Sequence, residues 1–170
     1  MRRSLLLLLF IGCAASGNKS TTLTTAVREG DVATVRALCA HGADPNQPSG
    51  GNGWVPLMHA VHKNQLGTAA ALLDAGADVD RADPGTMTPL MMAAGYGNRE
   101  MVALLLKHGA NPRVTDREGA TALDYAMTGM TDFDDFTFFR CQNETTALLK
   151  PSSPVPQKSS KRWSSIKGCA

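Results

Sequence analysis

The sequence predicts an all-α fold, a solenoid of about four helix-turn-helix units joined by projecting finger loops. The first observation is a Gly-Ala-Asp or Gly-Ala-Asn triplet whose glycine recurs 34 and then 33 residues apart, at Gly42, Gly76 and Gly109. The second is a leucine that recurs every 33 residues, at Leu57, Leu90 and Leu123. Repeats of this length indicate stacked units that bury their apolar faces against one another. Such arrays mostly present a surface to a partner, so a binding protein is the first expectation.

Composition suits packed helices and argues against a body that binds nucleic acid. Hydrophobic residues make up 43% of the 170 residues and aromatic residues only 5%. The formal net charge of +2 hides an asymmetry, because two basic residues lie at the N-terminus and five in residues 150–170. The body between them holds 10 basic residues against all 15 acidic residues of the chain, a net charge of −5. An acidic body does not suit a phosphate backbone.

The N-terminus has the three parts of a secretory signal peptide. Arg2 and Arg3 are followed by seven apolar residues, 5–11, and then by small residues at 12–17. Seven apolar residues are too few for a membrane span, which takes about twenty. The pattern therefore predicts a signal peptide over 1–15 and a short tether over 16–20. We expect an exported protein of the periplasm or cell envelope.

Cys13 indicates a particular kind of signal peptide. A cysteine after a small residue at the end of the apolar run resembles the lipoprotein box of bacterial signal peptides. That resemblance implies lipidation of Cys13 and attachment to a membrane through its acyl chains. Phe10 departs from the family, which usually has leucine there. Two alternatives stay open: ordinary cleavage near Ala15-Ser16, which would discard Cys13, and no cleavage.

The third unit, over 87–119, shows how each repeat is built. Thr88 can cap free backbone N–H groups, and Pro89 begins the first helix, where its missing N–H costs little. Gly97-Asn98 ends that helix with residues that accept a left-handed conformation. Apolar residues at helical spacing predict a second helix over 99–107. An extended turn over 111–119 then leads to the next unit.

The same design predicts units over 21–53, 54–86 and 120–149. The first unit has polar threonines in place of the Thr-Pro opening, as expected of an end unit whose outer face meets water. Its one extra residue falls in a Gly-rich loop over 47–54. In the last unit, helical spacing resumes only towards residue 147. The intervening stretch, 131–139, holds four of the five phenylalanines and either caps the open end of the stack or grips a partner.

These motifs resemble the ankyrin repeat. The family's Thr-Pro-Leu-x-x-Ala pattern is present at 88–93 and recurs in altered form at 55–60 and 121–126. Its Leu-Leu-x-x-Gly-Ala-Asp pattern is present at 72–78. The resemblance covers about 21–149 and implies helix pairs with hairpin-like fingers, stacked into a slightly curved slab. The family's histidine after Thr-Pro-Leu is replaced here by Met58, Met91 and Asp124, so its hydrogen-bond network is not expected in the same form.

The C-terminal residues and the remaining cysteines carry weaker signals of structure and function than the repeats do. Residues 150–170 are rich in Pro, Ser and Lys and are predicted to form a disordered basic tail. Trp163 is the one aromatic residue there and could anchor to a membrane or a partner. Cys39 replaces a repeat leucine and is expected to be buried. Cys141 and Cys169 could pair in an oxidising compartment.

No catalytic site, cofactor or metal site is predicted. His59 and His62 lie three residues apart on one helix and could share a metal ion. No carboxylate or cysteine joins them at a motif spacing, so a solvated helix face is favoured. Thioethers suit Cu(I), and three methionines recur at or beside one repeat position. That recurrence favours core packing over a metal site for Met58, Met91 and Met92.

The leading hypothesis is a non-catalytic protein-binding scaffold of the cell envelope. Ankyrin-like arrays usually bind through the concave face formed by first helices and finger tips. Trp54 and Tyr96 are the expected anchors, because aromatic side chains carry a disproportionate share of binding energy. The alternative is an inhibitor or immunity protein that neutralises one enzyme or toxin, and a basic partner would suit the acidic body. The full set of predicted contact residues is Trp54, His62, Lys63, Met87, Tyr96, Arg117, Glu118 and Tyr125.

Overall fold

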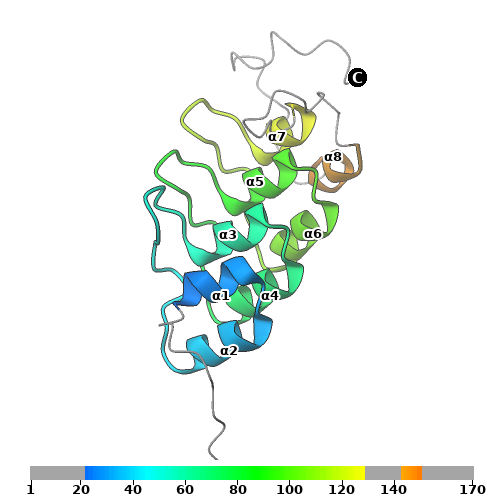
Figure 1. Cartoon of the computed structure of the whole chain (residues 1–170). Coiled ribbons are helices and arrows are strands. Elements are labelled where there is room, and N and C mark those ends of the chain that lie inside the picture. The colour runs from blue at the N-terminus through cyan, green and yellow to red at the C-terminus, as the bar shows by residue number, and fades with distance from the viewer. Residues whose placement is uncertain (1–21, 129–142, 151–170) are drawn as a thin grey trace, which may run out of the picture.

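The computed structural model describes residues 22–128 and 143–150, which form eight α-helices in two layers. One layer holds the first helix of each pair and the other holds the second (Figure 1). Each helix contacts its pair partner and the next helix of its own layer. The first helices are α1 (Leu23–Glu29), α3 (Pro56–His62), α5 (Pro89–Gly95) and α7 (Ala122–Thr128). The second helices are α2 (Val32–Ala40), α4 (Leu66–Asp74), α6 (Arg99–Lys107) and α8 (Asn143–Leu149).

The stacking in register that the sequence predicts is confirmed. Leu57, Leu90 and Leu123 hold the same position in α3, α5 and α7, and all three are buried. α6 has the predicted bounds, 99–107. Gly97 and Gly109 follow the two helices of this unit with φ of 70° and 89°, values that favour glycine. The described residues therefore form an all-α solenoid of four helix pairs, with finger loops on one side (Figure 1).

The N-termini of α3, α5 and α7 differ in how they are capped. The Thr88 hydroxyl accepts a hydrogen bond from the Met91 backbone N–H at 3.3 Å, and the Met91 sulfur accepts one from Thr88 N–H at 3.4 Å. At α7 the carboxylate of Asp124 takes over, accepting both the N–H and the hydroxyl of Thr121 at 2.7 Å. α3 begins after Val55 without a side-chain cap. Methionine and aspartate thus rebuild, at two of three positions, the network that histidine forms in the family.

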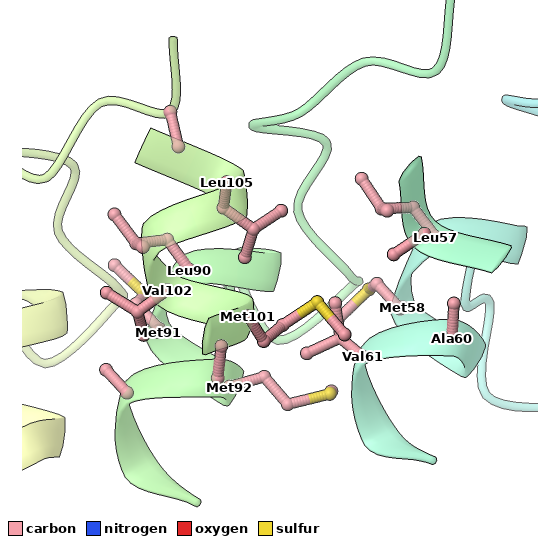
Figure 2. Close-up of a cluster of buried hydrophobic side chains, with 14 of the residues drawn as sticks. Leu57, Met58, Ala60, Val61, Leu90, Met91, Met92, Met101, Val102 and Leu105 are labelled. Carbon is pink, nitrogen blue, oxygen red and sulfur yellow. The ribbon is translucent and has the colours of Figure 1, made fainter. Parts of the chain in front are cut away.

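Methionine fills much of the space between the second and third helix pairs. Met58, Met91 and Met92 are each at most 1% exposed. Met101 of α6 is also fully buried and lies between the side chains of α3 and those of α5 (Figure 2). Thioether side chains adapt to irregular gaps. The prediction that these methionines pack in the core is confirmed.

The finger loops are tied to one another by hydrogen bonds between neighbouring units. The Asn46 amide accepts from Asp78 N–H at 2.7 Å and donates to the Gly76 carbonyl at 3.2 Å. One unit along, the Asp80 carboxylate accepts from Asn111 N–H at 3.0 and 3.2 Å. These bonds join residues about 31 positions apart and fix the register of successive fingers.

The delayed second helix of the last unit is also confirmed. α8 begins at Asn143, and it packs against both α7 and α6 as the second helix of a pair should. Several predictions lie outside the described residues: the signal peptide with Cys13, the phenylalanine-rich stretch 131–139, the Cys141–Cys169 pair and the tail after Lys150. Within 22–128 and 143–150, no helix has the length and apolar character needed to cross a membrane.

Candidate functional site

Three of the predicted contact residues meet in one row across α3 and the end of α5. The ring centroids of Trp54 and His62 are 5.3 Å apart, in an edge-on arrangement. The Nδ1 atom of His62 lies 2.9 Å from the Tyr96 hydroxyl, with the ring centroids 5.7 Å apart. All three side chains are half-buried. We call Trp54, His62 and Tyr96 the aromatic row.

Trp54 is positioned by the first finger loop, residues 47–54. The Ser49 N–H donates to the Trp54 carbonyl at 2.9 Å, and the Asn52 side chain accepts from Trp54 N–H at 3.2 Å. The Thr24 hydroxyl of α1 donates to the Ser49 hydroxyl at 2.7 Å, which ties the loop to the first helix. The inserted, Gly-rich loop is thus a folded turn that holds the largest side chain of the row.

His59 belongs to the same cluster, and the solvated helix face that the sequence favours for His59 and His62 is wrong, because both rings are half-buried against Trp54. Its ring lies 5.4 Å from Trp54, and its Nε2 atom is buried without a hydrogen-bond partner. Burial lowers the pKa of the His59 imidazole; Arg28 and His62 act in the same direction, whereas the Ser49 backbone acts against them. His59 therefore favours the neutral form. The i, i+3 spacing of the two histidines was the signal that they share a face.

Four other predicted residues lie around this row and along the fingers. Lys63 is exposed immediately after α3. Met87 is half-buried before α5, and its N–H donates to the Asp83 carboxylate at 2.9 Å. Arg117 and Glu118 are exposed at the third finger loop. The Arg117 guanidinium donates to the carbonyl of Pro84, which ties the second and third fingers together.

Tyr125 does not belong to the exposed surface, and its prediction as a contact residue is wrong. Its side chain is 4% exposed within α7. The hydroxyl donates to the Asp116 carboxylate at 2.8 Å, so that both its ring and its polar end are used inside the last unit. Asp116 also accepts from the backbone N–H groups of Glu118 and Ala120. The tyrosine therefore supports the third finger loop.

Two further features of the described residues bear on chemical reactivity. No three His, Cys, Asp or Glu side chains in 22–128 and 143–150 come together as a metal site. A hollow of about 310 Å³ lies between α2 and α4, in the other helix layer, lined by Arg36, Cys39, Ala40, Ala71, Asp74 and Ala75. Cys39 is half-buried, less than the sequence predicts, and burial raises the pKa of its thiol. That shift disfavours the nucleophilic thiolate.

Stacked helix pairs with an aromatic row on the finger side define a solenoid repeat protein of the kind that presents a surface to a partner. Two family models, both of ankyrin repeats, match the chain over residues 2–83 and 72–126. The repeats are therefore ankyrin repeats, and the fold is an ankyrin-type solenoid. Ankyrin repeats mediate protein–protein interactions, and the family is typically non-catalytic.

Relatives from several organisms share these repeats. Zygote-specific protein 3 of Chlamydomonas reinhardtii is 37% identical over 122 residues, which cover 70% of this chain and 32% of that protein. An ankyrin repeat-containing protein of Treponema pallidum is 36% identical over 104 residues, 61% of this chain and 35% of the relative. An ankyrin repeat protein of Neisseria meningitidis is 46% identical over 54 residues, 31% of this chain and 21% of the relative. The chain thus spans about a third of the length of the first two relatives.

Proposed function

We propose that this chain is a non-catalytic protein-binding scaffold of the cell envelope, which captures a partner on the face formed by its first helices and finger loops. We call this surface the finger face. The aromatic row is the observation that carries the proposal. Trp54, His62 and Tyr96 come from two units of the stack, so only the folded solenoid brings them together.

The physical argument concerns the energy that such a row can supply. Binding energy concentrates in a few aromatic side chains that lose their remaining water on contact. Trp54 and Tyr96 are half-buried and already held by His62, so a partner pays little side-chain entropy to order them. Exposed Lys63 and Arg117 supply charge at the edges of the face. An apolar centre with a polar rim is the usual anatomy of an interface.

Substitution of the row tests the proposal. Trp54→Ala combined with Tyr96→Ala should weaken partner capture from envelope extracts at least tenfold, since each anchor typically contributes more than about 1.4 kcal/mol. Lys107→Ala, on the exposed side of α6 in the other layer, is the matched control and should capture normally. Far-UV circular dichroism should report unchanged helix content in both variants. Equal capture by the two variants would refute the assignment of the finger face.

The envelope location is proposed from the N-terminal sequence. A basic start, a seven-residue apolar run and small residues around Cys13 favour export, with lipidation of Cys13 as the anchor. The ankyrin match that begins at residue 2 overlaps this segment. The mass of the N-terminal peptide from cells distinguishes the outcomes: an acylated Cys13 supports an anchored scaffold, and cleavage near Ser16 supports plain export. An intact, unmodified start would overturn the envelope location.

A second candidate is an inhibitor or immunity protein with one tight partner. The acidic body favours it, because all 15 acidic residues lie between the two basic ends of the chain. A basic enzyme or toxin would be attracted to such a body over a distance set by the Debye length. Co-purification at low and high salt separates the candidates. One stoichiometric, salt-sensitive partner supports the inhibitor, and several weaker partners support the scaffold.

A further inference from the structure

The His59 ring lies where the first finger loop meets the first helices. It is part of α3, and its ring packs against Trp54 at the end of that loop. The same loop is tied to α1 through the Ser49 and Thr24 hydroxyls, 2.7 Å apart. The Nε2 atom of His59 is buried and has no hydrogen-bond partner. A proton added there would create a buried N–H group without an acceptor, which costs free energy.

The charged groups around His59 make its protonation in the closed loop less favourable still. α1 contributes Arg28 and α3 contributes His62, and both disfavour a positive charge on His59. The loop itself, residues 47–54, contains no ionisable side chain. From α5 the neighbouring titratable group is Tyr96, whose hydroxyl is 2.9 Å from His62. The backbone of Ser49 is the group that favours the charged ring, and Ser49 is itself part of the loop.

We propose that the first finger loop is an acid-sensitive latch: protonation of His59 loosens the loop, moves Trp54 out of the aromatic row and releases the partner held on the finger face. The release step rests on the proposed function, whereas the opening of the loop does not. An open loop would let the imidazolium reach water. Its positive charge would then be solvated away from Arg28 and His62.

The direction of the pH dependence follows from linkage. Burial lowers the pKa of His59 in the closed loop below its ordinary value of about 6.5. The open loop therefore binds the proton more readily than the closed loop does. The closed loop is fully favoured above about pH 6.5, and that advantage is lost as the pH falls towards the lower pKa of the closed state. Each further pH unit in this range shifts the balance by up to about tenfold.

Tryptophan fluorescence tests the opening without any partner. Trp163→Phe leaves Trp54 as the only tryptophan, because the chain has two. Between pH 8 and 5, Trp54 emission should shift in a transition centred below about pH 6.5, while the far-UV dichroism stays constant. His59→Gln should abolish the transition. His41→Gln, at an exposed histidine of the first unit, should leave it in place. A transition that persists in His59→Gln, or that coincides with loss of helix signal, would overturn the latch.

A second measurement uses the unsubstituted histidines. Nuclear magnetic resonance should show the His59 ring and the Trp54 indole N–H responding with the same midpoint. If His59 titrated while the Trp54 indole N–H signal did not change, the latch would be overturned. This measurement does not depend on whether the His59→Gln variant folds. A captured partner should then dissociate over the same pH range, and less so from His59→Gln. If the partner dissociated to the same extent at every pH, the release step would be overturned. If no partner were captured at neutral pH, that result would count against the proposed function alone.

Discussion

Asp124 lies at the start of α7, at the position where α3 and α5 have methionine. The sequence alone marks this position only as a departure from the family's histidine. The structure shows a 4% exposed carboxylate that satisfies both the backbone N–H and the hydroxyl of Thr121. The Asp124 carboxylate thus takes the place of the histidine network. Without it, the Thr121 N–H and hydroxyl would be buried donors with no acceptor, which would destabilise the fold.

Asp124→Ala should therefore destabilise the protein by about 1–3 kcal/mol, since it leaves the Thr121 donors without an acceptor. Urea unfolding followed by circular dichroism measures the loss. Asp74→Ala, at an exposed aspartate at the end of α4, should change the free energy of unfolding by less than about 0.5 kcal/mol. Asp124→Ala within that same small range would show that the Thr121 bonds contribute little.

Two contacts show what the sequence could not predict at this scale. Trp54, His62 and Tyr96 were predicted as surface residues, but nothing in the spacing predicted that a hydrogen bond joins His62 to Tyr96 across 34 positions. Tyr125 occupies a first-helix position, which is why it was predicted to lie on the contact surface. Its hydroxyl finds Asp116 nine residues earlier, a pairing set by the path of the third finger loop.

At the scale of elements, the fingers form a connected strip along one side of the stack (Figure 1). Gly53 of the first finger packs against Pro84 of the second, and a Cβ added at Gly53 would lie 2.8 Å from Pro84 Cγ. Pro84 in turn accepts the Arg117 bond from the third finger. The φ of Gly53 is 68°, a conformation that side chains rarely adopt.

Gly53→Ala should thus cost about 1–3 kcal/mol, from the left-handed backbone and from the overlap with Pro84. It should also change Trp54 fluorescence, because Trp54 is the next residue. Gly51→Ala in the same loop is the matched control, since its Cβ would meet nothing within 4 Å. Thermal unfolding of the two variants provides the comparison. Equal stability would show that the first finger does not depend on its contact with the second.

Helices were easier to predict than the links between them. The bounds of α6 follow from apolar spacing and flanking glycines, which are local features. The bonds of Asn46 and Asp80 to the following unit depend on how units stack, so no local pattern marks these two side chains. The second helix of the last unit was predicted to lie late in that unit, because apolar residues return to helical spacing only near residue 147. The structure agrees, since α8 begins at Asn143.

For the whole molecule, each unit contacts mainly its neighbours, so stability should spread along the stack. Leu90 is fully buried in a central unit between two other first helices. Leu90→Ala should lower the free energy of unfolding by about 2–5 kcal/mol. Leu66→Ala, at a leucine that is 37% exposed at the start of α4, should cost less than about 1 kcal/mol. Similar losses in both variants would contradict a core stacked in register.

The proposed function depends most on which face of the solenoid meets a partner. A photoreactive phenylalanine derivative placed at Lys63, on the finger face, and separately at Lys107, on the opposite layer, tests this directly in native envelopes. Both positions are exposed, so both should be compatible with the fold. We predict a specific protein adduct from position 63 and none from position 107 after illumination. Adducts only from position 107, or the same adducts from both, would contradict binding on the finger face.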